Sequence, residues 1–316
     1  MEMKVYAIKH KDERIREASR SGGFFTALSD WFLNHKGVVY GCVLTEKYEA
    51  KHIRCIDKNV RNLMRGSKYI QSSMGNCFEL VKKDLDECKN VLFTGTSCQI
   101  DGLKHYLQRE YDNLFCLDIV CHGVPSKKVW IEYLKWLSKD DLGSISSVDF
   151  RNKVDFGWHT HVETITFKDG SKINSEVFQR LFYGHAVLRP SCYVCPYKNV
   201  FHPGDITIAD FWGIDKCKPE FDDNKGVSLV LVNTEKGLMY WDKIKDDLQV
   251  EESNIDDAMQ RPLIAPFPKP KNRERFWADF RSKKFSYIAR KYGGYGRVNA
   301  MKRLIKKNIK KIIRKN

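Results

Sequence analysis

The chain has 316 residues, ten cysteines and a formal net charge of +15. This length allows one large domain or two moderate ones, each with a buried core. Residues 1–19 are charged throughout, and no stretch reaches the roughly 18 apolar residues of a membrane-spanning helix, so we expect a cytoplasmic protein. Because cytosolic thiols stay reduced, clustered cysteines there indicate metal or redox chemistry rather than disulfides.

The excess positive charge is concentrated at the C-terminus. Residues 271–316 contain 17 Lys and Arg and 2 acidic residues, which leaves 38 of each sign in residues 1–270. Nucleic-acid binding needs a concentrated basic surface in the body of the chain, so we do not expect a nucleic-acid partner. Residues 301–316 place apolar residues near helical spacing between lysines and predict a basic amphipathic helix. Such a helix would contact an anionic membrane surface or a partner protein peripherally, or end the chain as a solvated helix.

The first elements in chain order predict a helix packed on a sheet. Residues 19–35 change from Ser and Gly to an apolar helical run, and residues 37–45 predict a strand. Residues 89–107 and 113–137 each predict a buried strand, a short turn and a helix. Two such units in succession indicate a parallel α/β core, in which ligands bind beyond the carboxyl ends of the strands.

After residue 145 the pattern becomes mixed α+β. Residues 162–173 predict a hairpin with its turn at Asp169-Gly170. Residues 204–214 predict a strand, and residues 226–244 predict a strand followed by a helix. Four prolines between residues 262 and 270 predict an extended connection, because proline cannot continue a helix.

The predicted fold is α/β (α+β) and has three parts. Residues 1–145 form a parallel-sheet α/β core that carries the ligand-binding loops. Residues 146–262 form a mixed α+β second half that contains a C-x-x-C pair. Residues 263–316 form a Pro-rich connection and a C-terminal helical basic tail.

Four cysteines form a candidate thiolate set. Cys98 and Cys121 occupy the same place in the two strand-turn-helix units, so their sulfurs would open onto one crevice if the strands are neighbours. Cys192 and Cys195 form the C-x-x-C pair, which can present two thiolates to one metal centre. Helix N-termini at Cys98 and Cys121 would supply amide N–H groups and positive dipole ends to the thiolates.

The spacing leaves three interpretations of this set open. Ligands from three separated segments suit a [4Fe–4S] cluster, whereas a structural zinc site more often uses two local C-x-x-C pairs. The thiols could also be buried without a metal. Cys217 is a plausible substitute ligand, and His122 is better explained as a hydrogen-bonding neighbour than as a ligand. The other five cysteines lie in apolar or amphipathic runs and are expected in the core: Cys42, Cys55, Cys77, Cys88 and Cys116.

The chain resembles the family of the beta subunit of coenzyme F420-reducing hydrogenase. Relatives in that family include F420-dependent dehydrogenases and sulfite reductases and a plant chlorophyll reductase. Eight stretches carry the resemblance, in family order from about residue 15 to about residue 215: SRSGGFFTAL, GVVYGC, RGSKYIQS, GTSCQIDGL, DIVCHGVPS, DFRNK, RPSCYVCPY and GDITIADFWG. Each stretch is a weak match alone, and their order makes the resemblance specific.

The resemblance implies an oxidoreductase that binds FAD beside a [4Fe–4S] cluster. It would move hydride between FAD and a substrate or F420-like carrier, and single electrons between FAD and the cluster. The family's cluster ligands fall on Cys98, Cys121, Cys192 and Cys195. No cysteine precedes Cys42, so we expect no second cluster. Some relatives belong to surface-polysaccharide gene sets, so a sugar intermediate or a redox partner protein is a further candidate for the second reactant.

Small residues before the first helix are the candidate phosphate cradle of the flavin. Ser19, Ser21, Gly22 and Gly23 would let backbone amides approach an anion closely, although a serine N-cap with glycine flexibility explains them too. In RGSKYIQS, Lys68 would offset charge, Tyr69 would stack on the ring and Gln71 would bond its edge.

Further flavin-binding candidates lie near the cysteines and in the second half. Those lining the crevice of Cys98 are Thr94, Gly95, Thr96, Ser97 and Gln99. Weaker candidates, which an ordinary edge strand explains almost as well, are Arg151, Asn152, Asp205, Thr207, Asp210 and Trp212. We assign no catalytic residue. Two other classes of function remain: a zinc-stabilised binding module, and an assembly protein docked to a membrane or partner through its tail.

Overall fold

The computed structural model describes residues 2–296, so the predicted basic helix over 301–316 lies outside the described residues. The chain forms two compact units that are interleaved in sequence. Among the described residues, the first unit comprises 2–124, 153–160 and 194–266, and the second comprises 125–152, 161–193 and 267–296. No helix among the described residues is long and apolar enough to cross a membrane. The sequence-based boundaries at residues 145 and 262 stay a prediction.

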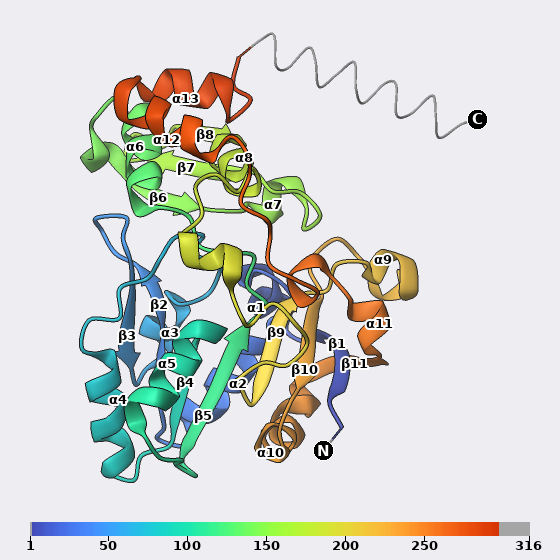
Figure 1. The fold of residues 1–316 in the computed structure, drawn as a ribbon. Helices are drawn as coiled ribbons and strands as arrows, with labels where there is room; N and C mark the ends of the chain where they lie inside the picture. The colour runs from blue at the N-terminus through green and yellow to red at the C-terminus, as the bar shows by residue number, and fades with distance from the viewer. Residues whose placement is uncertain (1, 297–316) are drawn as a thin grey trace. The chain divides into compact units, whose positions relative to one another are not determined.

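The first unit is built on an eight-stranded mixed sheet with the order β11-β1-β10-β9-β5-β4-β2-β3 (Figure 1). Its strands are β1 (Lys4–His10), β2 (Val38–Leu44), β3 (Ala50–Cys55), β4 (Val91–Thr96), β5 (Leu114–Ile119), β9 (Ile206–Asp210), β10 (Ser228–Val232) and β11 (Leu248–Ser253). The neighbours β2, β4, β5 and β9 are parallel, which confirms the predicted parallel core. The remaining pairs are antiparallel, and the sequence did not predict β1.

Helices cover both faces of this sheet. The helices of the first unit are α1 (Glu13–Ala18), α2 (Phe24–Asn34), α3 (Lys58–Asn62), α4 (Cys77–Asp86), α5 (Ser97–Leu107), α7 (Lys153–Phe156), α9 (Ile214–Cys217), α10 (Glu235–Ile244) and α11 (Ile255–Ala258), with 3-10 turns η3 (Pro219–Phe221), η4 (Lys245–Asp247) and η5 (Arg261–Leu263). On β4, Leu92 packs with α2 and α10, whereas Val91 and Phe93 pack with α4 and α5. This alternation places the two layers on opposite faces of a buried strand.

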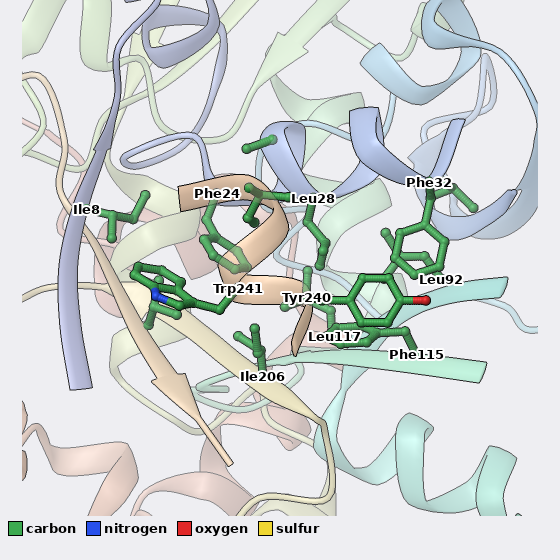
Figure 2. Close-up of a cluster of buried hydrophobic side chains, with 14 of the residues drawn as sticks. Ile8, Phe24, Leu28, Phe32, Leu92, Phe115, Leu117, Ile206, Tyr240 and Trp241 are labelled. Atoms are coloured by element: carbon green, nitrogen blue, oxygen red, sulfur yellow. The ribbon is translucent and has the colours of Figure 1, made fainter. Parts of the chain in front are cut away.

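Aromatic side chains fill the layer between α2, α10 and the sheet (Figure 2). The ring of Trp241 stacks on Tyr6 of β1 with centroids 4.2 Å apart, and Tyr240 stacks on Phe32 of α2 at 5.0 Å. Each such pair contributes about 0.5–1.5 kcal/mol beyond the burial of its area. The N-terminal strand is therefore held to the sheet by side chains as well as by its ladder.

A buried carboxylate ties β2, β3 and α4 together. Asp84, which is 3% exposed, accepts two hydrogen bonds from the Arg54 guanidinium at 2.7 and 2.9 Å. It also accepts one from the Tyr40 hydroxyl at 2.6 Å and one from Lys89 Nζ at 3.0 Å. Burial alone would raise the pKa of Asp84, but these donors lower it to about 2.

The second unit contains a three-stranded antiparallel sheet with the order β6-β7-β8. Its elements are β6 (Ile145–Asp149), β7 (Glu163–Phe167), β8 (Lys172–Ser175), α6 (Lys127–Leu137), α8 (Val177–Tyr183), α12 (Arg273–Ser282), α13 (Phe285–Lys291) and η1 (Leu142–Ser144), while η2 (Pro190–Val194) ends at the unit boundary. The predicted hairpin is β7–β8, with Gly170 at a φ of 84° in its turn. Trp130 of α6 packs on Phe150 and Phe178 in the core of this unit.

Glu163 is fully buried in the second unit. Its carboxyl group accepts hydrogen bonds from the Gln179 amide at 2.6 Å and from the Tyr133 hydroxyl at 3.4 Å. Burial raises the pKa of Glu163 well above its usual value, because a charged carboxylate loses its hydration there. The protonated form is therefore favoured in the folded state.

We expect Asp84→Asn to destabilise the first unit by about 3–5 kcal/mol, because it leaves the Arg54 guanidinium without its charged partner. The folded pKa is below the unfolded one, so this stabilisation is present above pH 4 and is lost as pH falls toward 2. Urea denaturation at pH 7 and pH 3 measures both effects. Asp86→Asn, at an exposed ion pair, is the control and should cost less than about 1 kcal/mol. An equal cost for the two variants would contradict the prediction.

We expect Glu163→Gln to raise the thermal stability of the protein more at pH 8 than at pH 5. The folded pKa of Glu163 lies above the unfolded one, so wild-type stability is fully present at low pH and is lost as pH rises through the folded pKa. Glutamine has no such titration and can still accept the Gln179 hydrogen bond. Differential scanning calorimetry measures the difference, and Glu132→Gln, at an exposed ion pair of α6, is the control. A benefit independent of pH would refute this account.

Candidate functional site

Cys98 and Cys121 leave the sheet from neighbouring parallel strands. In the register of β4 and β5, Thr96 pairs with Ile119, and each cysteine follows two residues later. Parallel neighbours lie about 4.8 Å apart, so the two chains leave the same edge of the sheet side by side. The prediction for Cys98 and Cys121 required that their strands be neighbours, and β4 and β5 are neighbours. Cys98 is exposed in the first turn of α5, and Cys121 is half-buried.

The start of α5 is held by a hydrogen-bond network. Gln99 Oε1 accepts from the Thr96 amide at 3.0 Å, and Gln99 Nε2 donates to Ser72 Oγ at 2.8 Å. The Thr96 hydroxyl lies 3.2 Å from Cys98 Sγ. A sulfur at this position lies at the positive end of the helix dipole and has the Thr96 hydroxyl as a neighbour.

The segment after the C-x-x-C pair is attached to the same helix. The Tyr197 hydroxyl donates to Asp101 Oδ2 at 2.6 Å, and Lys104 Nζ donates to the Pro203 carbonyl at 2.6 Å. Burial, the Asp101 carboxylate, and then the neighbouring thiols of Cys98 and Cys195 raise the pKa of Tyr197. Asp101 follows Cys98 by three residues and Tyr197 follows Cys195 by two, so this hydrogen bond links the segments that carry the two cysteines. Cys192, three residues earlier, belongs to the second unit.

Asp118, near the end of β5, belongs to a buried group of hydrogen-bonded polar side chains. His202 Nδ1 lies 3.0 Å from Asp118 Oδ2 and 3.0 Å from Ser97 Oγ. The Thr207 hydroxyl donates to the other Asp118 oxygen at 2.6 Å. The side chains of Asp118 and His202 are 0% and 1% exposed. Ser97 and Thr207, both flavin candidates from the sequence, thus have structural partners at the ends of β4 and β9.

The candidate phosphate cradle is packed against β1 and β10. The Ser19 hydroxyl donates to the Ile15 carbonyl, and the Ser21 hydroxyl donates to the Val227 carbonyl. A Cβ on Gly22 would lie 2.1 Å from the Ile8 oxygen, so only glycine fits there. Gly23, with a φ of 98°, is the N-cap of α2. The alternative of a serine N-cap is therefore wrong, and the phosphate role stays a prediction.

In RGSKYIQS, the ammonium group of Lys68 donates to the Leu63 and Arg65 carbonyls, both at 2.8 Å. Burial lowers the pKa of Lys68 to about 8. Tyr69 is half-buried and Gln71 is exposed. Ser72, one residue beyond Gln71, makes the contact with Gln99.

The crevice candidates Thr94 and Gly95 lie on β4. The Thr94 hydroxyl donates to the Tyr40 carbonyl at 3.0 Å, and its own carbonyl accepts from His52 Nε2 at 2.9 Å. Burial lowers the pKa of His52 to about 4, so the imidazole is neutral at physiological pH. A Cβ on Gly95 would lie 3.0 Å from Gln99 Oε1. The absence of a side chain at position 95 therefore leaves space for the Gln99 side chain.

The weaker candidates of the second half fall in both units. Asn152, in the second unit, donates to Thr164 Oγ1 at 3.0 Å. Asp210, in the first unit, accepts from Trp158 Nε1 at 3.1 Å. Asp205 accepts from the Cys116 amide at 2.8 Å and caps α10 through Thr234. Arg151 is buried, and Trp212 stacks on Trp158. These side chains have structural contacts, and their roles toward a flavin stay predictions.

The five cysteines predicted to lie in the core differ in their exposure. Cys55, Cys77 and Cys116 are buried, as predicted. Cys42 is half-buried. Cys88 is exposed with a φ of 58° just after α4, so its assignment to the core is wrong. The amphipathic pattern of α4 does not extend to this residue, because the chain has already left the helix.

Sequence reasoning missed the residues that join these segments. They are Ser72, Asp101, Asp118, Tyr197 and His202. Asp101 and Tyr197 stand inside the quoted stretches GTSCQIDGL and RPSCYVCPY, but no local pattern shows that residues 96 positions apart are bonded. His202 follows the C-x-x-C pair closely, and this proximity was the available sign.

The fit of a metal cluster rests on donor chemistry. Residues 2–296 contain no group of three or more His, Cys, Asp or Glu side chains gathered as in a metal site. Cys98 and Cys121 each follow a paired end of β4 or β5 by two residues, and Cys195 precedes Tyr197, which bonds to Asp101 of α5. Thiolates are the ligands of iron–sulfur clusters, and Cys98 Sγ lies in the first turn of α5, 3.2 Å from the Thr96 hydroxyl. The donor set fits a thiolate-bound cluster.

Comparison with known proteins gives one family and a group of solved structures. The family is described as the C terminus of the beta subunit of coenzyme F420 hydrogenase/dehydrogenase, and it matches residues 88–258, more than half of the chain. All four candidate ligands lie within the matched range. The quoted stretches before residue 88, including RGSKYIQS, lie outside it.

Thirteen chains of solved structures also match. One is a chain of the F420-reducing [NiFe] hydrogenase complex from Methanosarcina barkeri, with a TM-score of 0.56 and 18% sequence identity. The alignment covers 78% of the present chain and 81% of that chain. This likeness shows a shared fold. Comparison with curated protein sequences gives no match.

We expect Asp118→Asn to change the tautomer of His202. In the wild type the Asp118 carboxylate accepts only, so His202 Nδ1 carries the proton. An asparagine amide facing Nδ1 would move the proton to Nε2, which is buried and has no partner among the described atoms. The expected cost is about 1–3 kcal/mol. Nitrogen-15 NMR of the imidazole and urea denaturation measure the two effects, with Asp112→Asn at an exposed loop position as control. An unchanged Nδ1–H signal would contradict the assignment.

Proposed function

Because the chain belongs to the coenzyme F420 hydrogenase/dehydrogenase beta subunit family, a family of oxidoreductase subunits, we propose that it is a flavin- and iron–sulfur-dependent oxidoreductase. In this proposal, hydride passes between FAD and a substrate or F420-like carrier, and single electrons pass through a [4Fe–4S] cluster. The observation that supports it is the register of β4 and β5 together with the Tyr197–Asp101 hydrogen bond. The register sets Cys98 and Cys121 two residues beyond the pair Thr96 and Ile119, and the hydrogen bond attaches the segment after Cys195 to α5.

The proposed cluster ligands are Cys98, Cys121, Cys192 and Cys195. A cluster bound there would exchange one electron at a time, while FAD would supply the two-electron chemistry. The chain tunes such a site through its own groups. Donors to Cys98 Sγ would come from the first turn of α5 and, in one of its orientations, from the Thr96 hydroxyl, and they would withdraw negative charge from the sulfur. We expect these donors to raise the reduction potential of whatever the sulfurs bind.

The proposed flavin site begins at the same edge. Gln99 and Ser72 are fixed to each other, so their remaining hydrogen-bonding capacity has a defined direction. Lys68 has a pKa of about 8, so an anionic ring or phosphate nearby would hold it protonated. The other residues carried into this proposal are Ser19, Ser21, Gly22, Gly23, Tyr69, Gln71, Thr94, Gly95, Thr96, Ser97, Asn152 and Asp210.

The proposed partners follow from the reaction class. One is a hydride carrier or small-molecule substrate, including a sugar intermediate of surface-polysaccharide synthesis. The other is a redox partner protein, which supplies or removes electrons. A cytoplasmic location, with peripheral membrane contact through the basic residues of 301–316, completes the proposal.

Cofactor analysis of anaerobically purified protein tests the proposal. We expect about four iron and four sulfide per chain, together with about one FAD released on denaturation. Cys98→Ser and Cys195→Ser should each lower bound iron several-fold, because each removes a ligand. Cys88→Ser is the matched control, since Cys88 is exposed and lies outside the candidate site. It should leave iron and flavin unchanged.

Other results would replace the proposal. About one zinc per chain without iron would favour the zinc-stabilised binding module. Colourless protein without iron or releasable flavin would refute the redox function. Loss of iron from Cys88→Ser to the same extent as from Cys98→Ser would show that the ligand assignment is wrong.

A further inference from the structure

We propose that Tyr197 is a positioning residue whose hydrogen bond to Asp101 holds the Cys195 thiol next to Cys98. The inference rests on the proposed function, because it concerns how two of the proposed cluster ligands are kept together. It adds two residues that are not themselves ligands. Neither of them has a role that the sequence alone indicates.

The geometry joins the two thiols through short connections. Asp101 follows Cys98 by three residues on α5, so the two side chains share one helix face. Tyr197 follows Cys195 by two residues, which limits the distance between their Cα atoms to about 7 Å. Pro196 between them has a fixed φ and shortens the range of conformations further. A hydrogen bond of 2.6 Å between Tyr197 and Asp101 therefore ties the Cys195 segment to the turn that carries Cys98.

The hydrogen bond is of a strong kind. A phenol donating to a carboxylate is charge-assisted, and such bonds are short and about twice as strong as neutral ones. A phenol with an ordinary pKa of about 10 keeps its proton at neutral pH, so the Tyr197 hydroxyl is a donor there. Exposed His105 Nδ1 lies 3.3 Å from the same Asp101 oxygen and 2.9 Å from the Asp101 carbonyl oxygen.

Other contacts hold the following segment independently. Lys104 bonds the Pro203 carbonyl, and His202 is fixed between Asp118 and Ser97. Loss of the Tyr197 hydroxyl should therefore loosen the chain around Cys195 without unfolding the unit. The effect of Tyr197 on the position of Cys195 can therefore be measured in a variant that remains folded.

The first experiment measures the distance between the thiols in metal-free full-length protein. Dibromobimane, which links two thiols that approach within a few ångströms, is applied in a Cys192→Ser background to remove the neighbouring thiol. Mass spectrometry then quantifies the Cys98–Cys195 link. We expect Tyr197→Phe to slow its formation about tenfold, the scale of one charged hydrogen bond. Asp101→Asn keeps an acceptor oxygen, so its cross-linking rate should lie between the rates of Tyr197→Phe and the wild type.

The matched control is Tyr106→Phe, which removes a hydroxyl from an exposed tyrosine on the same helix. It should cross-link at the wild-type rate, and calorimetry should show similar melting temperatures for all the variants. Equal cross-linking rates for Tyr197→Phe and the wild type would overturn the inference. Because this measurement needs no metal, it tests the positioning role even if the cofactor proposal fails.

The second experiment uses the protein as purified with its cofactors. If the wild type binds iron, Tyr197→Phe should release it to a chelator about tenfold faster and show an altered electron paramagnetic resonance spectrum after reduction. Tyr106→Phe should match the wild type in both respects. If the wild type binds iron and Tyr197→Phe changes neither the rate of iron release nor the spectrum, the positioning role is refuted and the proposed function stays in place.

Discussion

The parallel pairing of β4 with β5 is the constraint on which the candidate site depends. It sets two strand ends at the same level and directs the following turns out of one edge of the sheet. A slip of one residue would move Cys98 relative to Cys121 and also turn the side chains of one strand to the other face. The buried alternation of Val91, Leu92 and Phe93 between two helical layers opposes such a slip. Core packing and site geometry are thus fixed by the same register.

Much of this architecture could be predicted from local patterns. The two strand-turn-helix units, the β7–β8 hairpin and the strand before α10 all carry their own periodicity and turn residues. The place of Cys98 and Cys121 followed from that pattern, because strand ends of a parallel sheet meet at one edge. The strand β1 was missed, since its charged ends concealed the apolar residues Val5, Ala7 and Ile8.

The unpredicted part consists of long-range polar contacts. Tyr197 with Asp101, His202 with Asp118 and Gln99 with Ser72 join segments that no periodicity relates. The interleaving of the two units is of the same kind, because a composition change at residue 145 does not show that the chain later returns to the first unit. Cys192 and Cys195 are three residues apart and belong to different units, which their spacing in the sequence does not show.

The position of β1 in the sheet affects the order of events during synthesis. Its neighbours are β10 and β11, which lie more than 200 residues later in the chain. At roughly 5–20 residues per second, the ribosome needs on the order of 10–40 s to produce them after β1 has been made. During that interval the strands that pair with β1 in the folded protein do not yet exist, so Val5, Tyr6 and Ile8 are unpaired. The nascent β1 segment is therefore a natural client for chaperones that bind short apolar segments.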